Sequence, residues 1–261
     1  MKPLSYICFF AFCTFIAKAN ATSKKDEFWL EASTFVEVIE DRGNAYSKLT
    51  KLSALSKPIL ESSLVRLQLF EVNVQYLKIY GSLRELENYY NKHLHHFSEG
   101  HVFYISYYAD YIMLHQLLNK SSELKKLLGE LKTNPADSKN IFYLAINLFL
   151  NSKKKNYEKL MEVCSNECNF SLYHISIMQY LKSNEHYKEL EDYAKNLLNG
   201  LISNNLMVSN IFFPQYVMAY YSFASKKMSK DDLSKKVFAS SIEKAGEGSF
   251  IYKQLVNIMR E

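Results

Sequence analysis

Apolar residues recur every three or four positions along most of the chain, and this spacing constrains the fold more than any other feature. Two of the clearest runs lie at Leu60, Leu64, Leu67, Glu71, Val74 and Leu77, in which Glu71 is the one polar exception, and at Tyr187, Leu190, Tyr193, Ala194, Leu197 and Leu198. The spacing is typical of α-helices that bury one face. Glycine and proline are scarce, with seven and four among 261 residues, which argues against a turn-rich β-sandwich or barrel. The sequence therefore predicts an all-α fold.

Short polar segments divide the chain into candidate helices that pair as antiparallel hairpins. The segment 102–108 is rich in β-formers, but its helical continuation favours a helix. Pro214 falls inside an apolar run, so the helix there either begins at the proline or bends. We expect helices near 26–41, 45–55, 59–80, 82–97, 102–119, 122–132, 139–151, 155–165, 170–183, 185–199, 204–225, 230–245 and 248–259.

The first 21 residues have the pattern of a cleavable secretory signal peptide. Lys2 precedes an apolar run from Leu4 to Ile16, and Ala19-Asn20-Ala21 gives the small-x-small pattern of a cleavage site. The alternative is an uncleaved N-terminal anchor, although the run is shorter than a membrane-spanning helix requires. We expect cleavage after Ala21, one domain over 22–261 and no transmembrane span in the mature chain. The expected location is the bacterial periplasm, or otherwise the cell exterior.

The cysteines and the net charge limit the chemistry that is open to the mature chain. Cys8 and Cys13 lie in the signal segment, which leaves Cys164 and Cys168. Residues four apart on a helix are about 6 Å apart, so this pair can form a disulfide in an oxidising compartment. The alternative is two partly buried thiols. The net charge of +5 is spread along the chain, so we expect a protein or peptide partner in the envelope or outside the cell, and no nucleic acid.

No common catalytic or nucleotide-binding motif occurs in the sequence, so we expect no catalytic site and no cofactor. His93, His96 and His101 form the best metal candidate, because the first two share a helical face and the third follows in the next turn. The competing interpretation is a polar helix end whose histidines complement the helix dipole, and it is the one we adopt. A metal-dependent enzyme that uses these histidines is the alternative function.

Tyrosines supply the best candidate binding surface. Neighbouring tyrosines cannot both face one core on a helix, so some are expected at the surface, where tyrosine suits binding. The alternative is that they pack between helices. The candidates are Tyr89, Tyr90, Tyr104, Tyr107, Tyr108, Tyr111, Tyr220 and Tyr221.

Two segments resemble the second helix of a tetratricopeptide repeat. They are GSLRELENYYNKHL from Gly81 to Leu94 and NEHYKELEDYAKNLL from Asn184 to Leu198. The Asn134-Pro135-Ala136-Asp137 segment resembles a junction between two repeats. The chain departs from the family where leucine replaces the usual small residue of the second helix, at Leu86, Leu127, Leu160 and Leu190.

The resemblance covers about residues 70–200. It implies an irregular α-solenoid of stacked helical hairpins with a groove for a partner, and it implies no activity. With the export signal, it leads us to expect an exported, non-catalytic scaffold that binds its partner through a Tyr/Phe-rich surface. An inhibitor or immunity protein would be a special case of this function.

Overall fold

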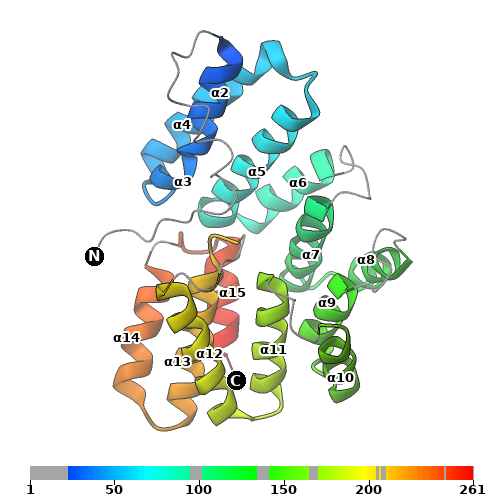
Figure 1. Cartoon of the computed structure of the whole chain (residues 1–261), viewed down its shortest axis with the longest axis vertical. Coiled ribbons are helices and arrows are strands. Elements are labelled where there is room, and N and C mark those ends of the chain that lie inside the picture. The colour runs from blue at the N-terminus through cyan, green and yellow to red at the C-terminus, as the bar shows by residue number, and fades with distance from the viewer. Residues whose placement is uncertain are drawn as a thin grey trace. The chain divides into compact units, whose positions relative to one another are not determined.

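The computed structural model describes residues 23–94, 102–133, 141–164, 170–203, 206, 210–243 and 245–260 (Figure 1). In these residues it contains fourteen α-helices, one short 3-10 turn and no β-strand. The predicted all-α class is therefore confirmed, and the segment beginning at Val102 is helical rather than extended. None of the described helices combines the length and the apolarity that a bilayer crossing requires.

The chain divides into two compact units. The first comprises residues 3–97 and 244–250, and the second comprises 98–243 and 251–261. The expectation of a single domain over 22–261 stays a prediction. The helices of the first unit are α2 (Lys24–Ser33), α3 (Phe35–Val38), α4 (Arg42–Ser56), the 3-10 turn η1 (Lys57–Ile59), α5 (Ser63–Tyr80) and α6 (Leu83–His93).

The second unit contains the remaining helices. They are α7 (Val102–Leu117), α8 (Ser121–Thr133), α9 (Ile141–Asn151), α10 (Lys154–Val163), α11 (Ser171–Ser183), α12 (Tyr187–Ile202), α13 (Phe213–Lys227), α14 (Asp231–Ile242) and α15 (Phe250–Met259). Phe250, the first residue of α15, is grouped with the first unit.

Polar caps fix where two helices of the first unit begin. The Asp41 carboxylate accepts a hydrogen bond from the backbone N–H of Asn44 at 2.9 Å, which starts α4. Ser82 and Glu85 form a capping box at the start of α6, in which each side chain accepts the backbone N–H of the other residue. These caps fix the first residues of α4 and α6, the α-helices that come before and after α5 in the chain.

Helix α5 is the centre of the first unit and contacts both α4 and α6. Val65, Val72 and Ile79 are buried at spacings of seven residues, so they form one apolar stripe. Phe70 is buried on the α6 side, where its ring centroid lies 5.7 Å from that of Tyr89 and 6.0 Å from that of Tyr90. Aromatic packing therefore joins α5 to α6.

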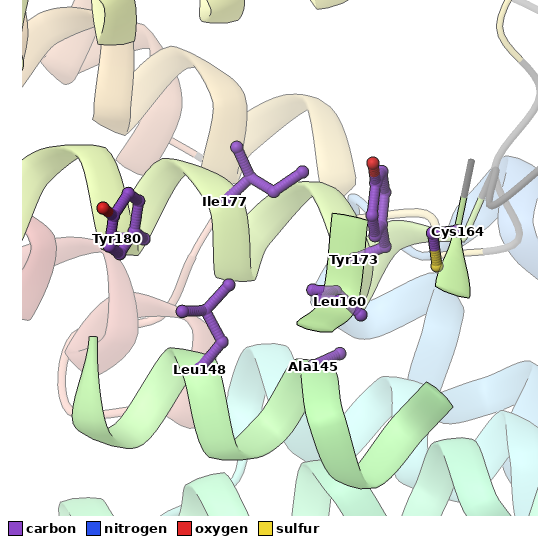
Figure 2. Packing of buried hydrophobic residues seen from close by; sticks show 7 residues of the cluster. All are labelled: Ala145, Leu148, Leu160, Cys164, Tyr173, Ile177 and Tyr180. Atoms are coloured by element: carbon purple, nitrogen blue, oxygen red, sulfur yellow. The ribbon is translucent and has the colours of Figure 1, made fainter. Parts of the chain in front are cut away.

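In the second unit, α9, α10 and α11 bury a shared apolar cluster. Figure 2 shows Ala145 and Leu148 of α9, Leu160 and Cys164 from the end of α10, and Tyr173, Ile177 and Tyr180 along α11. The rings of Tyr157 and Tyr180 stack with their centroids 4.4 Å apart. The contacts continue from α11 to both α12 and α13, and from α13 to both α12 and α14.

Two predicted helix boundaries are wrong, and each has a physical reason. The helix expected over 26–41 is interrupted at Thr34, whose hydroxyl donates to the Leu30 carbonyl at 3.1 Å and accepts from the Lys48 ammonium. The helix expected over 204–225 begins at Phe213, so of the two possibilities at Pro214 the start of the helix is confirmed. Pro214 occupies its first turn, where the missing backbone N–H costs no hydrogen bond.

Candidate interaction surface

Tyr46 on α4 projects from the first unit into solvent. Its relative exposure is 61%, and it is the one aromatic residue among the exposed large apolar side chains of the described residues. The position follows from the register of α4, because Ala45 and Leu52 occupy the buried face. A residue one position after Ala45 lies about 100° around the helix and so leaves that face.

Two tyrosines of α5 extend the ring of Tyr46 into an aromatic row. The centroids of Tyr46 and Tyr76 are 6.2 Å apart with the planes at 45°, and those of Tyr76 and Tyr80 are 5.2 Å apart at 50°. Tyr76 and Tyr80 are one helical turn apart, which places them on the same face of α5. Both are half-buried, so the row runs from the packed face of α5 out to the exposed ring of Tyr46.

Hydrogen bonding and charge hold the inner end of the row. The Tyr80 hydroxyl donates to the carbonyl of Ile39 at 2.7 Å, and the guanidinium carbon of Arg42 lies 5.9 Å from the centroid of the Tyr80 ring. Burial raises the pKa of Tyr80, and the negative charges of Asp41 and Glu40 raise it further. We call Arg42, Tyr46, Tyr76 and Tyr80 the tyrosine surface.

The tyrosines predicted from sequence divide into buried and half-buried members. Tyr90, Tyr108 and Tyr220 are buried. Burial also raises the pKa of Tyr89, which stacks on Phe70. Tyr89, Tyr107, Tyr111 and Tyr221 are half-buried, and the side chain of Tyr104 lies outside the described residues. Three of the seven described members are therefore packed between helices and four are partly open, so both interpretations stay open for the set.

The histidine and cysteine predictions fall only partly within the described residues. His93 is half-buried near the end of α6, with its ring centroid 4.5 Å from that of Tyr89, while His96 and His101 lie outside the described residues. No group of three or more His, Cys, Asp or Glu side chains suited to a metal ion occurs in the described part of the chain. Cys164 is buried after α10, and Cys168 lies outside the described residues, so the disulfide stays a prediction.

Two further titratable groups have pKa values that burial shifts. Burial raises the pKa of Glu71 on α5 to about 7, against an opposing effect of Lys78. The neighbouring amide atoms Nε2 of Gln68 and Oε1 of Gln75 are buried without a hydrogen bond. In the second unit, burial lowers the pKa of His174 to about 4, and its Nδ1 lies 2.8 Å from the Tyr193 hydroxyl.

Comparison of the chain with protein-family models, with curated proteins and with solved structures found no match. A functional interpretation therefore depends on the site itself.

Sequence reasoning missed the tyrosine surface because its three rings come from two helices. Tyr76 and Tyr80 show a four-residue spacing, but Tyr46 is 30 residues away. No local signal singles out Tyr46, because the Tyr89-Tyr90 pair, which packs on Phe70, is also flanked by polar residues, Asn88 and Asn91.

Proposed function

We propose that the chain, processed after Ala21, is an exported non-catalytic scaffold that binds a protein or peptide partner through the tyrosine surface. The exposure of Tyr46 carries this proposal, because 61% of the residue is open to solvent while its ring adjoins a second tyrosine. Tyrosine gives a large contact area and a polar hydroxyl at a small cost in side-chain entropy. It is also enriched among the residues that dominate binding energies.

The residues around Tyr46 have the composition of a binding hot spot. Arg42 contributes a second residue type that is enriched at interfaces, and the half-buried rings of Tyr76 and Tyr80 give the exposed ring a rigid support. A rigid support lowers the entropy lost on binding, since fewer side chains have to be ordered.

The helix contacts support the stacked-hairpin part of the proposal. Helix α11 contacts α9 and α13 as well as its neighbour α12, so successive helices pack in layers through this part of the second unit. Leu160 and Leu190, where the repeat family has a small residue, are both fully buried. An irregular solenoid of tetratricopeptide type would provide such layers.

Photo-crosslinking in the native host tests the binding function. A benzophenone side chain replaces Tyr46 in one variant and Ile202, an apolar residue with 66% exposure, in the control. We expect a discrete adduct from position 46 that position 202 does not give. Adding Tyr76→Ala should weaken that adduct about tenfold, the effect of losing one hot-spot residue. Identical adducts from both positions, or an adduct that Tyr76→Ala leaves unchanged in a folded protein, would contradict the proposal.

The number of adducts also tests the inhibitor or immunity special case. An inhibitor that neutralises one target should give a single partner in a one-to-one complex, whereas a general scaffold should give several. Native mass spectrometry of the cross-linked species measures this stoichiometry directly.

A further inference from the structure

Met161 on α10 is the methionine most open to solvent in the part of the chain that the structure describes. It is 39% exposed, and its neighbours Lys159 and Glu162 are exposed as well, so it lies on the outer face of the helix. The other described methionines are buried or half-buried: Met113, Met178, Met218, Met228 and Met259. The thioether of Met161 is therefore the one that a dissolved oxidant reaches most easily.

A tyrosine hydroxyl lies against this sulfur. The hydroxyl of Tyr173 on α11 donates to Sδ of Met161, with 3.4 Å between the oxygen and the sulfur. Tyr173 belongs to the apolar cluster that α9, α10 and α11 share, and only 8% of it is exposed (Figure 2). A donor from a packed cluster is thus held beside a sulfur that is open to water.

This contact satisfies the hydroxyl of Tyr173 only weakly. A thioether sulfur is a poor acceptor, and it is the one hydrogen-bond partner of this hydroxyl within the described residues. Burial raises the pKa of Tyr173, and the neighbouring Tyr157 raises it further, so the group stays a donor at neutral pH. A buried donor with a weak acceptor contributes less to stability than one with a full hydrogen bond. A stronger acceptor in the place of the sulfur would therefore stabilise the folded chain.

Oxidation of Met161 by a peroxide supplies such an acceptor. A lone pair of Sδ attacks one oxygen of hydrogen peroxide, the O–O bond breaks, and the other oxygen leaves as water after proton transfer. The sulfur loses two electrons, the peroxide gains them, and the product is the polar methionine sulfoxide. Because the hydroxyl lies 3.4 Å from Sδ, an oxygen bonded to that sulfur can come within about 2.7 Å of it, the usual length of an O–H···O hydrogen bond.

We propose that Met161 is a site of reversible oxidation by peroxides, at which the hydroxyl of Tyr173 binds the sulfoxide oxygen. Oxidation at this site stabilises the folded chain, whereas oxidation of a buried methionine such as Met178 would put a polar group into the core. The proposal does not depend on the binding function, because Met161 and Tyr173 lie in the second unit and the tyrosine surface lies in the first.

Limited treatment of the purified protein with dilute hydrogen peroxide tests the selectivity. Peptide mass spectrometry follows the gain of oxygen at each methionine, and we expect Met161 to be oxidised before the half-buried Met218 and Met228. Met228→Leu is the matched control, in which Met161 should be oxidised at the rate found in the wild-type protein. Oxidation of Met218 or Met228 as fast as that of Met161 would contradict the proposal.

The stability of protein oxidised at Met161 tests the role of Tyr173. Urea denaturation compares it with the reduced protein in the same cysteine state, and the equilibrium constant of unfolding should fall about fivefold, the effect of gaining one hydrogen bond. Tyr173→Phe should show no such gain. Each variant is compared with its own reduced form, so any packing lost in Tyr173→Phe cancels. An equal gain in Tyr173→Phe, or no gain in the wild-type protein, would overturn the proposal.

Reduction of the sulfoxide tests whether the change is reversible. Methionine sulfoxide reductases that act on the two epimers should restore the thioether of Met161 and return the unfolding equilibrium to that of untreated protein. Peroxide-treated Met161→Leu, which lacks the sulfur, should show neither the gain nor its reversal. A gain that persists after Met161 is reduced, or that also occurs in Met161→Leu, would place the effect elsewhere and overturn the proposal.

Discussion

Lys230 binds the carboxylate of Glu191 with its ammonium nitrogen 2.6 Å from one oxygen and 2.9 Å from the other. Glu191 lies on α12 and its side chain is only 6% exposed, whereas Lys230 immediately precedes α14. The Ser225 hydroxyl on α13 donates to the same carboxylate at 3.3 Å. One buried charge therefore connects three helices, and the hydrogen bond from Lys230 is the main reason that the pKa of Glu191 is lowered.

Removing the lysine should destabilise the chain, because the glutamate would remain buried. We expect Lys230→Ala to lower the free energy of unfolding by about 2 kcal/mol, less than for a fully buried pair because Lys230 is partly exposed. Urea denaturation at pH 7 measures this change in the free energy of unfolding. Lys188→Ala is the control: that lysine lies 3.7 Å from the same carboxylate and 2.9 Å from Asp192, but it is 65% exposed, so its loss should cost much less than that of Lys230. Equal effects of the two variants would refute this account.

His174 should make the chain less stable in acid. Its pKa is about 4 in the folded chain and about 6.5 when unfolded, so the unfolded chain binds the proton first as the pH falls. The contribution of neutral His174 to the free energy of unfolding is therefore complete above pH 6.5. It is lost as the pH falls from 6.5 through 4, by about 3 kcal/mol in total.

The variant His174→Gln keeps a hydrogen-bonding side chain but does not titrate. Its stability deficit should therefore shrink between pH 6.5 and pH 4. His186→Gln removes a histidine that is 49% exposed and serves as the control. Equilibrium unfolding at five pH values gives the slopes, and a deficit that stays constant for His174→Gln would refute the assignment.

Glu71 should have the opposite pH dependence. Its pKa is raised to about 7 in the folded chain, so the folded state retains the proton that the unfolded state has released. Stability is highest below pH 4.5 and falls as the pH rises through 7. We expect Glu71→Gln to raise the free energy of unfolding by about 2 kcal/mol at pH 8 and to change it little at pH 4. Glu61→Gln, at an exposed site, is the control, and a pH-independent gain at position 71 would count against this explanation.

The helices could be predicted from the sequence because their signals are local. The apolar spacing and the polar turns locate most helices to within a few residues. Pro214 marks the start of α13, because a residue without a backbone N–H is tolerated in the first turn of a helix. The break at Thr34 could not be found in this way. It coincides with a hydrogen bond from Lys48, 14 residues further along the chain, so it depends on how α2 and α4 pack.

The tyrosine surface could not be predicted for a related reason. The chain has 20 tyrosines, and a tyrosine on a helix is buried or exposed according to which face its neighbours cover. Tyr90 of α6 is buried against Phe70 of α5, and Tyr220 of α13 is buried with its hydroxyl bonded to Gln179 of α11, while Tyr46 is exposed one residue after the buried Ala45. Periodicity locates a helix, but the contacts between helices select the exposed ring.

The histidine hypothesis gives a direct test of the alternative function. We expect purified protein to contain less than stoichiometric zinc and copper, because histidines near a helix end are better explained by the helix dipole. Metal analysis by mass spectrometry measures the content. Stoichiometric metal that disappears in His96→Ala, but not in the exposed-site control His186→Gln, would favour the metal-dependent enzyme over the scaffold.

The last prediction joins export to the cysteine pair. If the signal segment is removed after Ala21, the mature chain begins at Thr22 and keeps only Cys164 and Cys168. In an oxidising compartment these two should form a disulfide, so the intact mass should correspond to residues 22–261 less two hydrogen atoms. Reduction should lower the free energy of unfolding by about 2 kcal/mol, the loop-closure value for so short a loop.

The variant Cys168→Ser is the control for this bridge, because it leaves the buried Cys164 in place and removes only its expected partner. It should match the reduced wild-type protein in stability and should not respond further to reductant. Replacing Cys164 instead would put a hydroxyl into the apolar cluster with Leu160 and Tyr173, so its effect would combine packing with the loss of the bridge. A wild-type mass that includes Met1 would refute cleavage after Ala21. A mass that shows no loss of two hydrogen atoms would refute the bridge.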